Sequence, residues 1–249
     1  MNSIPTLVER EAILDQIANE LKKRLGQNII SAIAYGSALC EDFMLLSDYD
    51  ILLVLDDTNV DYLNIVRDVK KFFTGRGIMV DLNVRSMAEM PQYRANAFWH
   101  NNRSYYMRLE LDIYGKVLIG KNLFHADSIL PAELALEGVR VISSLVYQAR
   151  KILINRPLDT EERIRMMKFC IYAVLYALAM HQRFPKTKMD AMKIFHDVYP
   201  DLQDPLFFLE AKISAPEDIS DEIVYNAYGF LLKLDQHIFD LYAKSHETH

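Results

Sequence analysis

Apolar and polar residues follow two different periods along the chain. In the first half, short apolar runs rich in branched residues are bounded by glycine and polar turn residues, which predicts β-strands. Between these runs, apolar residues recur at helical spacing, so helices are expected to alternate with the strands. The predicted strands cover residues 29–35, 50–55, 78–84 and 113–119.

Helices in this first half have recognisable boundaries. Thr6 and Glu9 have the spacing of a capping box, so a helix is predicted to begin there, and Gly26 is a plausible end for it. A second helix is predicted from Thr58 to Phe73, and a third includes residues 105–111. The strands and helices together predict a small domain over residues 1–125.

From about residue 130 onward every segment has helical periodicity. Two apolar stripes run through residues 164–178 and 223–241, with breaks at Phe184-Pro185 and Tyr199-Pro200. Stripes of this kind usually pack into a core. The predicted fold class is therefore α+β, with a small mixed-sheet domain followed by an antiparallel helical bundle over residues 126–249.

The charge balance narrows the range of partners. The chain has 249 residues and a net charge of −6, so it has no global field that would attract nucleic acid. A cationic small molecule, or a nucleotide that already carries Mg²⁺, suits such a protein better. The longest uncharged run, residues 169–182, is too short to cross a bilayer, and the N-terminus has no features of a signal peptide. We expect a cytoplasmic protein without a membrane partner.

Two cysteines, Cys40 and Cys170, lie in apolar or helical surroundings. They form no cluster with the spacing of a zinc site, so two reduced and buried thiols are expected.

The residues that carry chemistry begin with Asp48 and Asp50. Two positions apart at the start of a strand, their side chains point to the same face, while Tyr49 points to the other. Neighbouring carboxylates repel each other unless a cation lies between them, and hard oxygen ligands suit Mg²⁺ or Mn²⁺. A solvated strand end is the alternative interpretation of this pair.

A third acid, Asp81, lies in the next predicted strand between Val80 and Leu82. An acid among apolar residues is costly to bury without a partner. If the two strands are neighbours, Asp81 can face the same site as the first two acids. Three convergent carboxylates could hold two metal ions for in-line phosphoryl transfer.

Gly36 and Ser37 follow the first strand. A strand that ends in Gly-Ser and turns into a helix offers free backbone N–H groups, which favour an anion. The glycine lets a phosphate approach closely, and the serine hydroxyl adds a donor.

Taken together, these elements closely resemble the DNA polymerase β-like nucleotidyltransferase superfamily. Its motif is a hydrophobic residue with Gly-Gly or Gly-Ser, a gap of roughly ten residues, an Asp-x-Asp/Glu pair and a later acidic strand; the matching positions are Tyr35-Gly36-Ser37, Asp48-Tyr49-Asp50-Ile51 and Asp81. The resemblance covers residues 29–85. It implies that Gly36 and Ser37 hold the β- and γ-phosphates and that Asp48, Asp50 and Asp81 hold two Mg²⁺ ions. Asp81 could instead accept the proton of the acceptor hydroxyl.

The helical second half is similar to that of antibiotic nucleotidyltransferases, which modify aminoglycosides or lincosamides. This similarity implies that Lys188, with Lys186 as the alternative, contacts the triphosphate of ATP. It also leaves room for a homodimer that completes the site. Glu110 and Asp112 could line an acceptor pocket, or they could be ordinary residues at the end of an element.

The expected activity is Mg²⁺-dependent transfer of a nucleoside monophosphate, AMP from ATP, to a hydroxyl of a small molecule such as an aminoglycoside, with release of pyrophosphate. Two alternatives stay open. One is an antitoxin-like protein adenylyltransferase, and the other is a catalytically inactive protein that senses nucleotides or binds partners.

Overall fold

The computed structural model describes residues 4–43, 47–90, 104–124, 129–154, 158–202, 204–214 and 218–247. The chain divides into two compact units, Met1–Ser128 and Ile129–His249, called here the N-terminal unit and the C-terminal unit. None of the described helices is long and apolar enough to cross a membrane.

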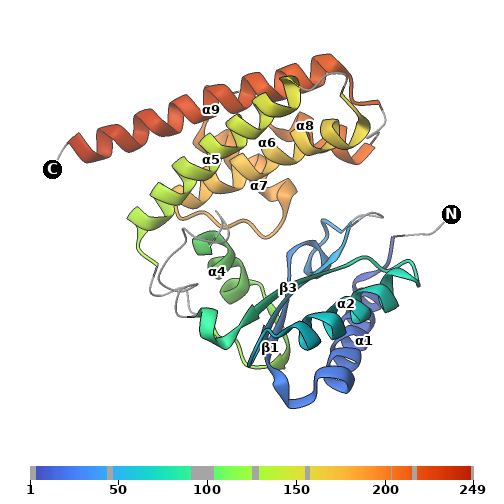
Figure 1. The fold of residues 1–249 in the computed structure, drawn as a ribbon. Coiled ribbons are helices and arrows are strands. Elements are labelled where there is room, and N and C mark those ends of the chain that lie inside the picture. Colours follow the sequence, from blue (N-terminus) through green and yellow to red (C-terminus); the bar gives the residue numbers. More distant parts are fainter. Residues whose placement is uncertain are drawn as a thin grey trace. The chain divides into compact units, whose positions relative to one another are not determined.

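A mixed sheet forms the centre of the N-terminal unit (Figure 1). Its strands are β1 (Ile29–Tyr35), β2 (Tyr49–Leu55), β3 (Val80–Ser86) and β4 (Lys116–Gly120). In the described residues the order is β3-β2-β1-β4, with β1 antiparallel to both β2 and β4 and with β2 parallel to β3. The predicted α+β class with a mixed sheet is confirmed.

Helices cover both faces of this sheet (Figure 1). The helices α1 (Leu7–Leu25) and α2 (Val60–Thr74) pack with Ile51 and Leu53 of β2 in one apolar cluster. On the other face, Leu52 and Val54 pack with side chains of α4 (Ser104–Ile113). Because alternate residues of a strand point to opposite faces, the even-numbered positions of β2, including Asp50, belong to the α4 face.

Capping side chains determine where α1 and α2 begin. The Thr6 hydroxyl accepts a hydrogen bond from the Glu9 amide at 3.3 Å, and the Glu9 carboxylate accepts one from the Thr6 amide at 2.7 Å, so the predicted capping box is confirmed. The predicted start of α2 at Thr58 is wrong. Asn59 is the N-cap, because its side chain accepts a hydrogen bond from the Tyr62 amide at 3.0 Å.

Two predicted strands begin later than expected. Ile78 donates its amide to the Phe73 carbonyl at 3.1 Å, which ties it to the end of α2, so β3 begins only at Val80. Likewise Tyr114 donates its amide to the Glu110 carbonyl at 3.0 Å and continues the end of α4. The fourth strand therefore begins at Lys116 rather than at Ile113.

The described part of the C-terminal unit is a bundle of helices, as predicted (Figure 1). They are α5 (Pro131–Ile154), α6 (Thr160–Met180), α7 (Lys188–Val198), α8 (Leu206–Ser214) and α9 (Asp221–Glu247). The central helix is α6, which packs against the other four. Aromatic contacts join Phe230 to both Phe195 and Phe208, so α9 also belongs to the core.

Of the two free cysteines, Cys170 is buried, whereas Cys40 is only partly buried. The prediction of two buried thiols is thus wrong for Cys40, which follows the turn after β1 rather than lying inside an element.

Candidate active site

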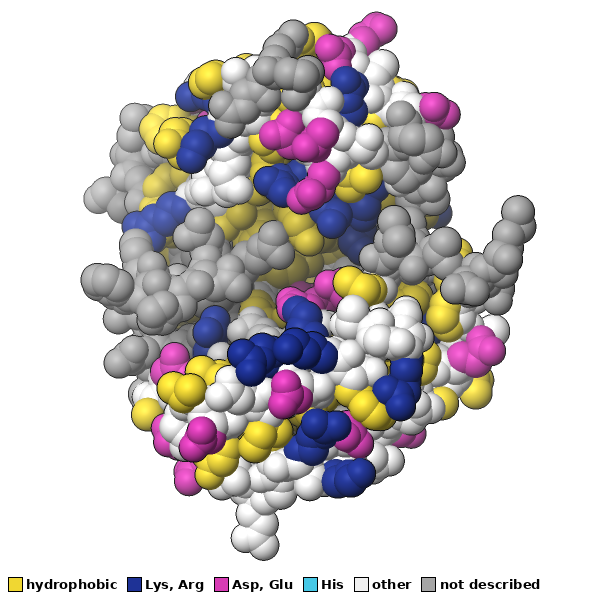
Figure 2. Space-filling view, turned by 45° about the vertical axis from the view of Figure 1, so that its right-hand side comes forward, with side chains coloured by type: hydrophobic (Ala, Val, Ile, Leu, Met, Phe, Trp, Pro, Cys, Tyr) yellow, Lys and Arg dark blue, Asp and Glu magenta, His cyan; other side chains and the backbone are white. Residues whose placement is uncertain are grey.

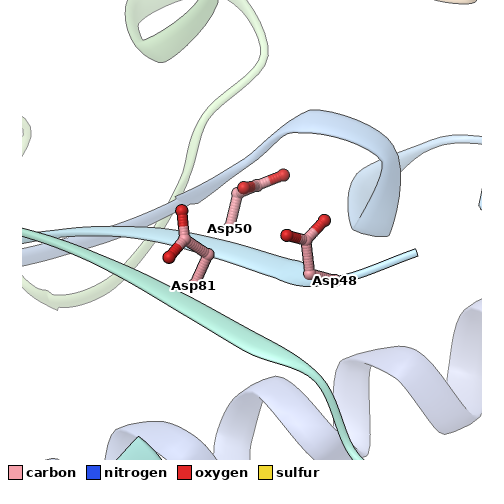
Figure 3. Close-up of side chains that lie close together, drawn as sticks. All are labelled: Asp48, Asp50 and Asp81. Carbon is pink, nitrogen blue, oxygen red and sulfur yellow. The ribbon is translucent and has the colours of Figure 1, made fainter. Parts of the chain in front are cut away.

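The parallel pairing of β2 with β3 brings the predicted acids together. Asp50 and Asp81 are register partners on these two neighbouring strands. Asp48 lies two residues before Asp50, so its side chain points to the same side of the strands, as Figure 3 shows. One ligand oxygen from each of the three carboxylates lies within 4.8 Å of the other two.

This donor set fits a magnesium site. Mg²⁺ prefers carboxylate oxygens at about 2.1 Å in an octahedron, so ligands on opposite sides of one ion are ~4.2 Å apart. The limit of 4.8 Å between the three carboxylate oxygens is of this size. A second ion would need further oxygens, such as those of a phosphate chain. Because the carboxylates repel one another, a divalent cation between them would be strongly favoured.

Asp81 is not buried, contrary to the interpretation from the sequence. Its side chain is 52% exposed, and the Oδ1 atom lies 3.3 Å from the Nζ atom of Lys70. In the described part of the sheet β3 is an edge strand, and Lys70 of α2, which packs on the opposite face, reaches Asp81 there.

Gly36 connects the turn after β1 to the acids. Its φ angle is +74°, and a Cβ atom at this position would lie 2.8 Å from the Oδ2 atom of Asp50. The preceding residue, Tyr35, is the register partner of Asp50. Backbone and carboxylate are therefore in direct contact, and this contact requires glycine.

The predicted helix after β1 is a short 3₁₀ turn, Gly36–Leu39. The Cys40 amide donates to the Ser37 carbonyl at 3.2 Å, and Cys40 itself is extended, which ends the turn. Ser37 is partly buried within it. The turn still offers backbone amides to an anion, but it has no helix macrodipole behind it.

Tyr35 and Asn83 were not identified from the sequence as site side chains. Burial raises the pKa of the Tyr35 phenol, the Asp50 carboxylate raises it further, and a hydrogen bond with Asn83 acts in the opposite direction. Glu110 and Asp81 make smaller contributions that also raise this pKa. The phenol therefore stays protonated beside the acids. The signal for Asn83 was its position two residues after Asp81, on the same side of β3.

Lys188 and Lys186 belong to the C-terminal unit. Lys188 is the first residue of α7 and follows the N-cap Thr187, whose hydroxyl accepts the Asp190 amide at 3.0 Å. It is partly buried, whereas Lys186 is exposed. A contact of either residue with a triphosphate stays a prediction. Glu110 and Asp112 lie on α4, and their part in an acceptor pocket also stays a prediction.

Charged groups of both signs share the molecular surface. In the view of Figure 2, Lys and Arg side chains are interspersed with Asp and Glu side chains. In the N-terminal unit the helix α2 contributes the exposed bases Arg67, Lys70 and Lys71. Of these three bases, Lys70 lies beside an acid of the site, Asp81.

The fold is similar to that of a solved structure, the spectinomycin adenyltransferase AAD(9) from Enterococcus faecialis with ATP and spectinomycin. The TM-score is 0.60 at 13% sequence identity, and the match covers 92% of this chain and 99% of that one. At this identity the comparison establishes a shared fold. No protein-family model and no curated protein matches the sequence.

Proposed function

We propose that the chain is a magnesium-dependent nucleotidyltransferase. The observation that carries this proposal is the convergence of Asp48, Asp50 and Asp81 directly beside the backbone of Gly36. A cluster of acids alone would support only a cation site. The glycine turn against Asp50 adds backbone donors for an anion, and metal and phosphate together are what a nucleoside triphosphate requires.

In this proposal each residue of the site has a role. Asp48, Asp50 and Asp81 hold up to two Mg²⁺ ions, and bound Mg²⁺ supplies charge neutralisation for the phosphates and a lower pKa for the attacking hydroxyl. Gly36 and Ser37 bind the β- and γ-phosphates through the amides of the turn. Tyr35, protonated and next to Asp50, is a further hydrogen-bond donor on this face.

The reaction joins the oxygen of an acceptor hydroxyl to the α-phosphorus of ATP. The bond between that phosphorus and the bridging oxygen of pyrophosphate breaks, and the electron pair leaves with pyrophosphate. The hydroxyl proton passes to a carboxylate. Asp81 is the candidate for this role, in place of its metal contact, because it is exposed and lies beside Asp50. The half-buried Asp50 then keeps its role as a ligand of Mg²⁺.

The small-molecule acceptor is supported by two separate points. The neighbour in fold carries spectinomycin with ATP, and the alignment extends over both units of the present chain. The net charge of −6 also favours a cationic acceptor over a nucleic acid. We therefore place an aminoglycoside-like molecule first among the acceptors, with Lys188 as a contact for the triphosphate and antibiotic resistance as the biological role.

The direct test measures acceptor-dependent release of pyrophosphate. The protein is incubated with Mg²⁺, one of the four nucleoside triphosphates and a panel that includes spectinomycin, aminoglycosides and lincosamides. Mass spectrometry of the acceptor should show the addition of one AMP unit. Asp48→Asn and Asp50→Asn should each lower the rate on the order of 100-fold or more, because they remove metal ligands.

Asp56→Asn is the matched control. Asp56 is exposed and follows β2 at the end opposite to the three acids, so its variant should keep full activity. The proposal fails if no triphosphate gives acceptor-dependent pyrophosphate and Mg²⁺-dependent nucleotide binding is also absent. If a polypeptide is labelled and no small molecule is, the proposed class of acceptor is wrong, but the proposed nucleotidyl transfer stands.

A further inference from the structure

Arg10 lies beneath the turn that follows β1. It occupies the buried stripe of α1, one helical turn before Leu14, and it is only 6% exposed. Its Nη1 atom donates to the carbonyl oxygens of Ser37 at 3.2 Å, Ala38 at 3.4 Å and Cys40 at 2.5 Å. One side chain of α1 therefore holds three carbonyls of the turn.

The guanidinium is a buried charge without a carboxylate partner among the described residues. Besides the three carbonyls, it contacts the Thr6 carbonyl at 3.4 Å through Nε, and its Cζ atom lies 5.1 Å from the centre of the Phe43 ring. It also acts on Tyr49: burial raises the pKa of that phenol, and Arg10 lowers it. A buried cation that is balanced only by dipoles and rings leaves a positive field around it.

The direction of the carbonyls has a consequence for the amides. In a planar trans peptide the N–H group points opposite to the C=O group of the same unit. In the 3₁₀ turn Gly36–Leu39 the amides of Ala38 and Leu39 are used by the turn's own i→i+3 hydrogen bonds, so the turn leaves the amides of its first residues, Gly36 and Ser37, for an anion. These amides point toward the start of the turn, whereas the carbonyls of Ser37 and Ala38 point toward Arg10. Arg10 thus holds the turn by its carbonyls and leaves the amide side of the turn open to an anion.

We propose that Arg10 is a positioning residue for the triphosphate. It locks the turn in the orientation that presents its amides, and its charge behind the turn favours the negative charge of the phosphates in front of it. The inference rests on the proposed function and assigns a role to a residue that does not touch the nucleotide.

The test compares Arg10→Met, Arg10→Lys and wild type. For Arg10→Met we expect the KM for ATP, and the Kd for Mg²⁺ with a non-hydrolysable ATP analogue, to rise by roughly tenfold. The KM for the acceptor should change by less than about twofold, since the contact acts on one substrate only. Arg10→Lys keeps the charge and loses the fork of donors, so its KM and Kd for the nucleotide should lie between those of wild type and those of Arg10→Met.

Arg24→Met is the matched control on the same helix. Arg24 pairs with Glu20 at 2.6 Å and lies over the Phe72 ring at 5.7 Å, away from the turn, so nucleotide binding should be unchanged. A variant that is merely less stable would lower the active fraction and leave the Kd of the folded protein unchanged. Unfolding curves recorded for each variant separate these effects.

Three outcomes overturn the inference. Equal nucleotide Kd values for folded Arg10→Met and wild type overturn it alone, whereas a wild-type protein that binds no triphosphate overturns the proposed function with it. If Arg10→Met does not fold, amide hydrogen exchange in wild type decides. The amides of Gly36 and Ser37 should gain protection when Mg²⁺ and the analogue bind, and unchanged exchange at both overturns the inference.

Discussion

A methyl group on residue 36 would lie 2.8 Å from the Oδ2 atom of Asp50. The turn after β1 and the first residues of β2 thus constrain each other, because the preceding residue, Tyr35, is also the register partner of Asp50. The two parts of the sequence motif, the Gly-Ser turn and the acid pair, meet at this contact. A side chain at position 36 would therefore have to displace the Asp50 carboxylate.

The first prediction is that Gly36→Ala abolishes activity beyond its effect on stability. The φ angle of +74° costs a side chain about 1–2 kcal/mol, and the clash with Asp50 adds displacement of a metal ligand. We expect nucleotidyl transfer to fall by on the order of 100-fold. Urea unfolding and pyrophosphate release measure the two effects separately.

Gly77→Ala is its control. Gly77 has a φ of +76°, nearly the same as Gly36, but a Cβ atom there meets nothing within 4 Å. Its variant should lose a similar amount of stability and keep its activity. Equal losses of activity in both variants would show that backbone strain alone, rather than the contact with Asp50, explains the effect at Gly36.

The second prediction concerns metal removal. Without metal the three acids repel one another, so Asp48→Asn should stabilise the protein slightly in EDTA and raise the midpoint of thermal unfolding. The gain in the free energy of unfolding should be less than about 1 kcal/mol, because Asp48 is exposed. With Mg²⁺ the order should reverse, because the wild type gains more from binding the ion. Melting curves in EDTA and in Mg²⁺ test both signs, with Asp56→Asn as the variant that should behave as wild type in each. A wild-type curve that Mg²⁺ does not shift would rule out a metal site at these acids.

Much of the fold could be predicted because its signals are local. The strand 29–35 has the predicted bounds, and the capping box of Thr6 with Glu9 involves four consecutive residues. The start of β3 could not be predicted so well, because the Ile78 amide bonds back to Phe73 at the end of the preceding helix. Such a bond depends on how the chain turns, and hydrophobic periodicity does not report it.

Some side chains near the acids could also be predicted from local sequence signals, and others could not. Asp48 and Asp50 share a face because of strand geometry, and Asp81 joins them only through the parallel register of β2 and β3. Arg10 carries a readable signal, since it is a charged residue on the apolar stripe of α1. Lys70 carries none, because its approach to Asp81 depends on the edge position of β3.

The third prediction is a pH effect on stability from His181. Partial burial lowers the pKa of this imidazole, Arg183 and His237 lower it further, and the Nε2 atom lies 2.8 Å from the Tyr199 hydroxyl. The fold therefore favours the neutral ring. Above the unfolded-state pKa of about 6.5 this contribution is fully present, and as the pH falls below that value the unfolded state takes up the proton first and stability declines.

Because His181 is exposed, the loss of stability at low pH should be small. It should be visible when the pH profiles of wild type and a variant are compared. His181→Gln keeps a partner for Tyr199 and removes the titration. Its unfolding free energy should decline less than that of wild type between pH 7 and pH 5.5. Parallel pH profiles for the two proteins would contradict the lowered pKa.

The fourth prediction is that Lys70 competes with the metal for Asp81. Its Nζ atom lies 3.3 Å from the Asp81 Oδ1 atom, and both side chains are about half exposed, at 49% and 52%. An exposed pair contributes less than about 1 kcal/mol, so Lys70→Met should lower the metal-free stability only slightly. It should also tighten Mg²⁺ binding by roughly two- to fivefold, because a positive charge next to the ligand is removed.

Titration with Mg²⁺ at low and at high salt measures this effect. The difference between wild type and Lys70→Met should shrink as salt increases, since exposed charges are screened over ~10 Å at 0.1 M. Lys71→Met, which removes an exposed charge at the next position of α2, should bind the metal as wild type does. Weaker binding by Lys70→Met would reverse the interpretation: Lys70 would then hold Asp81 in place for the metal, because loss of an orienting cation leaves the carboxylate free to turn away.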